Sequence, residues 1–151
     1  MDDECSEAIA EGLSRNTTLR SLDISNNRIG GPSLKRWQEV IGKCNLRHFD
    51  ISNNNLYDEG AQFLIRGLME GPLVTEEMLR AHPNIGPLWS RLVPKLKYVH
   101  MKNVNMGDET GVLITQLISQ NKRLLKLAID NNTMNFRYIE EINAACARNR
   151  Q

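Results

Sequence analysis

The sequence has few cysteines and no long apolar run. Its three cysteines, Cys5, Cys44 and Cys146, are odd in number and widely spaced, which argues against a disulfide framework and favours a reducing compartment. No apolar run approaches the roughly 20 residues that span a bilayer. The opening residues 1–5 are acidic and lack the basic and apolar regions of a signal peptide. We therefore expect a cytoplasmic protein, with a nuclear or cytoskeletal location as the alternative.

Neither sign of charge dominates, and no motif for chemistry is present. The 19 Lys and Arg residues are nearly balanced by 18 Asp and Glu, whereas a nucleic acid or an anionic membrane favours a strongly basic face. The sequence has no phosphate-binding glycine loop, no His-Glu-x-x-His and no Gly-x-Ser-x-Gly. Cys44 is expected to be a small filler rather than a nucleophile. We expect no enzyme, no cofactor, no nucleic acid and no membrane.

The chain does contain an internal repeat. Four segments, starting at Leu19, Leu46, Leu96 and Leu124, share the pattern apolar-x-x-apolar-x-apolar-x-x-Asn-x-apolar, with Val104 in the Asn position of the third. The starts lie 27, 50 and 28 residues apart, so one interval is too long by about 22 residues. Segments 3–13, 58–68 and 108–118 also align, with helical spacing of apolar residues and an acidic start that favours the helix dipole.

These alternating strand and helix motifs resemble the ribonuclease-inhibitor-like subfamily of leucine-rich-repeat proteins. The resemblance covers nearly the whole chain apart from the region between Met69 and Val93. It implies an α/β solenoid with a curved parallel sheet of about four strands inside and helices on the convex side. We expect one domain over residues 1–151, with a non-repeat insertion at about 70–94. The resemblance does not identify a partner, because this scaffold hosts many functions.

Stacking explains why such units fold, since one strand and one helix cannot bury their apolar faces alone. Trp37 aligns with Leu64 of the next unit, so we expect a buried aromatic rather than a binding hot spot. Val104 cannot form amide hydrogen bonds, so its turn should be irregular, or Asn103 or Asn105 should substitute. The residues expected to fill the core from the strands are Leu22, Ile24, Phe49, Ile51, Val99, Met101, Leu127 and Ile129. Those expected to bond neighbouring turn backbones are Asn27, Asn54 and Asn132.

Alternation along each strand sends the other side chains to the concave face. Asp23 and Asp50 should lie side by side, either as an acidic spot for a basic partner or as part of a solvated polar face. His48, Asp50 and His100 could be metal ligands, but no close His or Cys spacing supports a zinc site, and we expect no metal. The predicted partner-binding residues on this face are Ser21, Asp23, Ser25, His48, Asp50, Ser52, Tyr98, His100, Lys102, Lys126 and Asp130; Ala128 shares it.

The predicted insertion holds four of the five prolines. Insertions in solenoids map to loops that often bind, and Trp89 is the residue expected to make contact there. The alternatives are an insert that packs on itself and a repeat whose strand has eroded.

The leading hypothesis for function is a non-catalytic intracellular protein–protein interaction module or adaptor, within a cytoskeletal or ciliary assembly. One alternative is a regulator of a small GTPase. An activator of nuclear-transport GTPases resembles this architecture but carries an acidic tail, which residues 147–151 lack. Another is an actin-capping module of the tropomodulin type.

The last expectation concerns the two ends of the repeat array. The sequence starts just after one strand motif and ends just before another, with no visible capping repeat. We expect either a fragment of a longer repeat protein or a chain whose end strands are completed by self-association or by a partner. The alternative is a short solenoid that tolerates frayed edges.

Overall fold

The fold consists of one parallel sheet and one layer of helices. A computed structural model describes residues 1–69, 80–81 and 95–151. The strands β1 (Ser21–Asp23), β2 (His48–Asp50), β3 (Tyr98–His100) and β4 (Lys126–Ala128) are parallel and lie in chain order. Each falls within a predicted strand motif. Because β2 pairs directly with β3, the long interval between their motifs does not interrupt the sheet.

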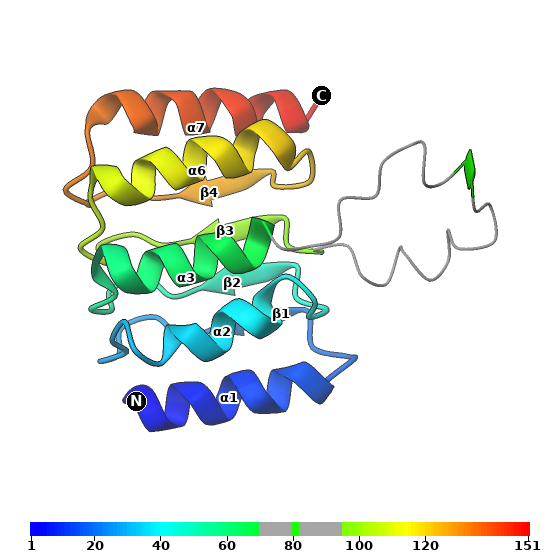
Figure 1. Cartoon of the computed structure of the whole chain (residues 1–151), viewed down its shortest axis with the longest axis vertical. Coiled ribbons are helices and arrows are strands. Elements are labelled where there is room, and N and C mark those ends of the chain that lie inside the picture. The colour runs from blue at the N-terminus through cyan, green and yellow to red at the C-terminus, as the bar shows by residue number, and fades with distance from the viewer. Residues whose placement is uncertain (70–79, 82–94) are drawn as a thin grey trace.

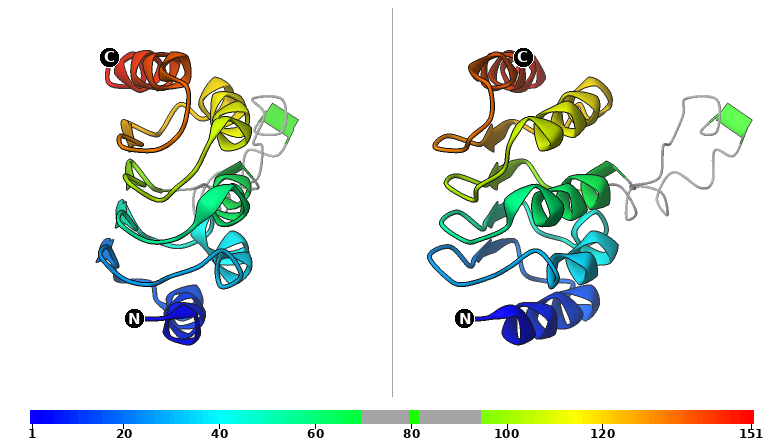
Figure 2. Two further views of the ribbon diagram at one scale, coloured as in Figure 1. Left: turned by 90° about the vertical axis from the view of Figure 1, so that its left-hand side faces the viewer. Right: turned by 60° about the vertical axis from the view of Figure 1, so that its left-hand side comes forward.

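Five helices in the described part of the chain stack beside one another along the sheet (Figure 1). They are α1 (Asp3–Arg15), α2 (Leu34–Ile41), α3 (Tyr57–Met69), α6 (Asp108–Gln120) and α7 (Phe136–Asn149). Figure 2 shows that they all cover the same face of the sheet. The predicted α/β solenoid is therefore confirmed, and the face left uncovered is the predicted concave face.

The core lies between the two layers. Trp37 of α2 is fully buried, its ring stacks on Phe49 with centroids 5.0 Å apart, and its Nε1 donates to Ser6 Oγ at 2.9 Å. This confirms the prediction of a buried aromatic. Leu22 is the exception among the predicted core residues, because it is only partly buried; its strand β1 is at the edge of the sheet. The strand residues that are buried as predicted are Ile24, Phe49, Ile51, Val99, Met101, Leu127 and Ile129.

Asparagines link the turns that follow the strands. The buried Asn54 donates to Ile24 O at 3.1 Å, in the preceding turn, and its Oδ1 accepts from Ile29 N at 3.0 Å. Asn132 likewise donates to Met101 O at 2.9 Å. The predicted role is confirmed for both. Asn27 donates to carbonyls of its own turn. Its Oδ1 accepts from the amino group of Met1, one repeat earlier, at 3.0 Å.

Val104 fills the same position with a fully buried apolar side chain. The predicted irregularity is confirmed at Asn105, which has a φ of 62°, whereas the equivalent Asn55 is not among the positive-φ residues. The predicted substitution by a neighbouring asparagine is wrong for Asn103, because its amide donates outward to Asn53 Oδ1 at 3.0 Å. The turn is held instead from the next repeat, where Asn132 Oδ1 accepts from Val104 N at 2.9 Å.

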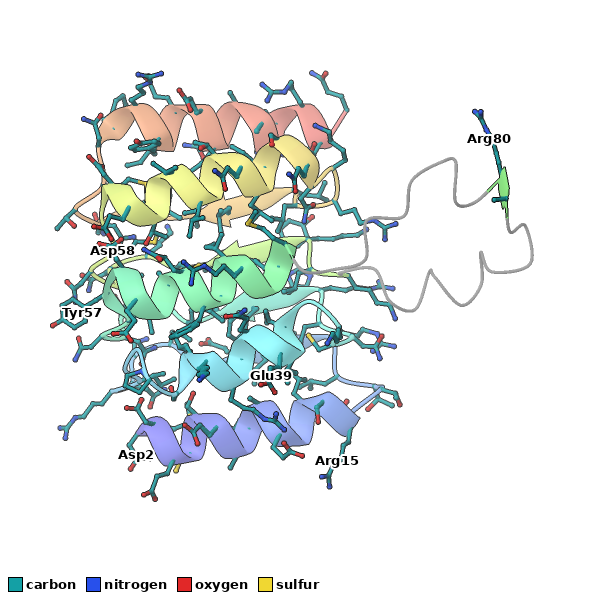
Figure 3. The ribbon with its side chains drawn as sticks, viewed as in Figure 1. Asp2, Arg15, Glu39, Tyr57, Asp58 and Arg80 are labelled. Atoms are coloured by element: carbon teal, nitrogen blue, oxygen red, sulfur yellow. The ribbon has the colours of Figure 1, made fainter. Side chains whose placement is uncertain are left out.

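Acidic residues at the helix starts also connect the repeats. Asp3 Oδ1 accepts from Gly30 N at 2.6 Å, and Asp108 Oδ1 accepts from Asn135 N at 2.6 Å. Between them, Asp58 of α3 accepts from Gly107 N at 2.9 Å and from Thr110 (Figure 3). The sequence indicated only a dipole role for these residues. Each carboxylate in fact bonds the backbone that starts the helix of the following repeat.

Candidate functional site

Side chains on the concave face form rows that run across the strands. The register places Ser21, His48, Tyr98 and Lys126 in one row, and Asp23, Asp50, His100 and Ala128 in the next. Neighbouring members of a row are about 4.8 Å apart at the backbone. The rows therefore bring together residues that are up to 105 positions apart in the sequence, from Ser21 to Lys126.

The acidic spot contains two carboxylates and one imidazole. Asp23 pairs with Asp50 in the strand register, as predicted. His100 Nδ1 lies 3.3 Å from Asp50 Oδ2, and both side chains are about one third exposed, at 33% and 30%. Hydrogen bonding by Ser25, including its N–H to Asp23 Oδ1 at 2.9 Å, lowers the pKa of Asp23, and the nearby His100 contributes less. The carboxylate form of Asp23 is thus favoured at the open face.

An aromatic platform borders the acidic spot. The rings of His48 and Tyr98 are nearly parallel, at 8°, with centroids 4.5 Å apart. Together with the acids they surround a shallow hollow of about 210 Å³, lined by residues of β1, β2 and β3. This stacked pair was not predicted, because the long interval in the sequence left the pairing of β2 with β3 open.

The third row, beyond the strand ends, differs from the prediction. Ser52 is buried, with 6% exposure, and its Oγ accepts from Lys102 N at 3.1 Å. The prediction that Ser52 lies open to a partner is therefore wrong, since its hydroxyl bonds the turn that follows β3. Lys102 Nζ forms an ion pair with Asp130 Oδ2 at 3.0 Å. Ala128 is also buried, so the fourth repeat presents mainly Lys126 of β4 and Asp130 of the turn that follows it.

The other candidates from the sequence are a metal site, the thiol of Cys44, a membrane-spanning helix and the predicted insertion. Within residues 1–69, 80–81 and 95–151, no group of three or more His, Cys, Asp or Glu side chains is arranged to hold a metal. Cys44 is buried as predicted, and burial raises the pKa of its thiol. No helix in those ranges has the length and apolar character needed to cross a membrane. Trp89 and most of the predicted insertion lie outside the described residues, so their binding role stays a prediction.

Comparisons with known proteins agree with this architecture. A family model described as "Leucine Rich repeat" matches residues 15–35 and 42–64. The chain is similar to the solved structure of leiomodin-1 actin-binding site 2, with a TM-score of 0.73 and 16% identity, over 99% of this chain and 75% of that one. It is also similar to a tropomodulin C-terminal domain from Caenorhabditis elegans, with a TM-score of 0.50 and 19% identity, over 99% and 94%. A search of curated protein sequences gives no match.

At these identities the likeness concerns the fold. The matched repeats, the parallel strands and the helices on one face give this chain a leucine-rich-repeat fold. The ribonuclease-inhibitor-like subfamily remains an inference from the strand and helix motifs.

Proposed function

We propose that this chain is a non-catalytic protein-interaction module that binds a basic side chain of a partner protein in the hollow over β1, β2 and β3. The observation that carries this is the row of Asp23 and Asp50 beside the stacked rings of His48 and Tyr98. Like charges in neighbouring strand positions do not favour folding. A cation placed between them would relieve that repulsion.

The shape of the hollow favours an arginine or lysine from a protein over a small substrate. Its volume of about 210 Å³ is below the roughly 300–1,000 Å³ of typical small-molecule sites. A guanidinium group can bond a carboxylate and stack on an aromatic ring at the same time. Asp50 and Tyr98 offer those two contacts on neighbouring strands.

The test compares two pairs of substitutions that remove the same charge. Asp23→Asn with Asp50→Asn changes the hollow, and Glu4→Gln with Glu7→Gln changes exposed residues of α1. Proteins captured by the unmodified chain and by the α1 variant should be lost with the Asp23/Asp50 variant. With a purified partner, the association rate and its salt dependence should fall as well, because exposed charge acts mainly on encounter. Equal capture by all three proteins would contradict the proposal.

Actin is a second candidate partner. The solved structure named for the actin-binding site of leiomodin-1 aligns over 99% of this chain. Co-sedimentation with actin filaments and a binding assay with actin monomers test this directly, and the absence of binding in both would reject it.

We place the module in the cytoplasm, because all three cysteines are free and a reducing compartment keeps them so. A broad activity screen tests the proposal that the module is non-catalytic. Turnover that survives repurification would overturn that proposal.

A further inference from the structure

A second charged surface lies along the edge of the solenoid where helices end and strands begin, at the right-hand side of Figure 1. We call the turns 16–20, 42–47, 95–97 and 121–125 the basic rim. These turns contain no Asp or Glu. Their charged residues are Arg20, Lys43, Arg47, Lys95, Lys97, Lys122 and Arg123. The chain is nearly neutral as a whole, so this edge concentrates one sign of charge.

Three repeats of the rim enclose a hollow of about 400 Å³, here called the basic hollow. It is lined by five cations and one partly buried leucine: Arg47, Lys95, Lys97, Lys122, Arg123 and Leu125. The backbone aligns them, since Lys97 N donates to Arg47 O at 3.0 Å and Leu125 N donates to Lys97 O at 2.8 Å. Residues that are distant in sequence therefore meet at one place.

The five cations lack charge partners among the described residues. None of them takes part in the ion pairs found there. Lys95 Nζ donates to the neutral Asn45 side chain, and Lys122 Nζ donates to Ser119 O at 2.9 Å. The hollow thus gathers positive charge that no acidic side chain among the described residues neutralises through an ion pair.

Stabilisation of helix ends by cations accounts for only part of this arrangement, namely the bond from Lys122 Nζ to Ser119 O in the last turn of α6. That effect falls off beyond the last turn of a helix. The last turns of α2 and α6 contain no basic residue. Arg47 and Lys97 stand instead immediately before β2 and β3, where the concentration of charge serves no helix.

We propose that the basic hollow binds a short, extended, acidic segment of a partner protein, at a site separate from the concave face. The two strand spacings from β2 to β4 amount to about 10 Å, which about three extended residues cover. Carboxylates would meet the lysines and arginines, and the carbons of the segment would contact Leu125.

A nucleic acid fits the lining less well. Proteins that bind single strands usually stack bases on aromatic side chains, and none of the lining residues within the described part of the chain is aromatic. A bilayer surface also fits less well, because the cations surround a hollow and interfacial binding relies on a broad apolar face.

The experiment measures binding of a fluorescein-labelled glutamate octapeptide to the full chain by fluorescence anisotropy, at low and at physiological ionic strength. Lys97→Glu with Arg123→Glu reverses charge in the basic hollow. Arg28→Glu with Lys35→Glu makes the same change in net charge at exposed residues outside it. We expect at least about tenfold weaker binding for the first pair and less than about twofold for the second.

Several outcomes would overturn the proposal. One is the absence of octapeptide binding to the unmodified chain. Another is an equal loss of affinity in both variants, which would show that the octapeptide is attracted to net charge alone. Tighter binding of an oligothymidylate or of phosphatidylserine vesicles, lost in the same variant, would mean that the partner is not an acidic protein segment. Circular dichroism checks folding, and if the charge-reversed variant unfolds, Lys97→Gln with Arg123→Gln should still weaken binding at least about threefold.

The Asp23/Asp50 variant should bind the octapeptide no more weakly than the unmodified chain. Failure of this proposal is therefore distinguishable from failure of the proposed concave-face function.

Discussion

Gly12 and Gly67 occupy the same position in two repeats, and we predict opposite effects when each is changed to alanine. Each precedes a leucine near the end of its helix, Gly12 in α1 and Gly67 in α3. A methyl group at Gly67 would lie 2.6 Å from both Gln38 O and Ile41 Cγ2 of α2. A methyl group at Gly12 would meet nothing within 4 Å.

The magnitudes follow from two competing terms. Alanine is favoured over glycine inside a helix by about 0.5–1 kcal/mol. Nothing opposes this gain at Gly12, so Gly12→Ala should raise the melting temperature by about 1–4 °C for a domain of this size. Overpacking costs about 1–3 kcal/mol, and the upper part of that range applies at Gly67 because a backbone carbonyl cannot rotate away. Gly67→Ala should therefore lose about 1–2.5 kcal/mol and lower the melting temperature by about 2–10 °C.

Thermal and urea unfolding followed by circular dichroism would measure both variants against the unmodified chain. An unchanged urea m-value would show that the surface exposed on unfolding is the same, so that the midpoints report stability. If Gly67→Ala were as stable as the unmodified chain, the close approach of α2 and α3 would be refuted. Destabilisation by Gly12→Ala would refute the open space beside Gly12 in α1.

Three further substitutions test the contacts between and within repeats. Asp58→Asn should lower the free energy of unfolding by about 1.5–3 kcal/mol at neutral pH. Partial burial works to raise the pKa of Asp58, but hydrogen bonds from Thr110 and Gly107 outweigh it, and the pKa is lowered. Its contribution is therefore present above the unfolded pKa of about 3.9 and lost as the pH falls through the folded pKa, so urea unfolding at several pH values should show the difference shrinking in acid. Asn54→Ala should cost about 1–3 kcal/mol in urea unfolding, and more than Asn27→Ala, because the bonds of Asn54 to the preceding turn are buried whereas the bond of Asn27 to Met1 is exposed; equal costs would contradict the stronger linking role of Asn54. Trp37→Phe should cost about 1–3 kcal/mol, and an unchanged melting temperature would contradict the tight core around its ring.

The fold was predictable because the repeat sets the apolar positions independently of their context. Phe49 and Val99 occupy the same place in the pattern and pack at the same level of the core. The periodicity does not predict which side chains are buried beyond the strand ends. Ser52 obeys the alternation that sends side chains to the open face, yet it is buried and accepts a hydrogen bond from Lys102 N in the turn after β3.

The candidate site was predictable only in part. The Asp23–Asp50 pair follows from two motifs at a regular interval. The contacts of His48 with Tyr98 and of Asp50 with His100 depend on which strand follows β2 in the sheet. A 50-residue interval leaves that choice open, since a whole extra strand would fit within it.

The basic rim was missed for a different reason. A balanced total charge predicts a neutral surface only when the charges are mixed in space. In this chain the repeat separates them, because acids open α1, α3 and α6 and bases stand in the turns before strands. Stacking then adds like charges along each edge, as Arg47, Lys97 and Arg123 show. Net charge is therefore a poor guide to the partners of a solenoid, and charge counted by position in the repeat is a better one.

The separation of charge also bears on how the chain would act as an adaptor. The hollow beside Asp23 and Asp50 on the concave face and the basic hollow on the rim carry opposite charge. Their lining residues differ, although both include parts of the second and third repeats. Two partners of opposite charge can be held at once only if the sites do not exclude each other. The Debye length is about 8 Å at physiological ionic strength, so charges separated by more than about two strand spacings are largely screened from each other. The two linings adjoin in the chain, at Arg47–His48 and at Lys97–Tyr98, so salt at that concentration should reduce the coupling between the two hollows without abolishing it. At low ionic strength each ligand should instead strengthen binding of the other, because each neutralises charge that repels its counterpart.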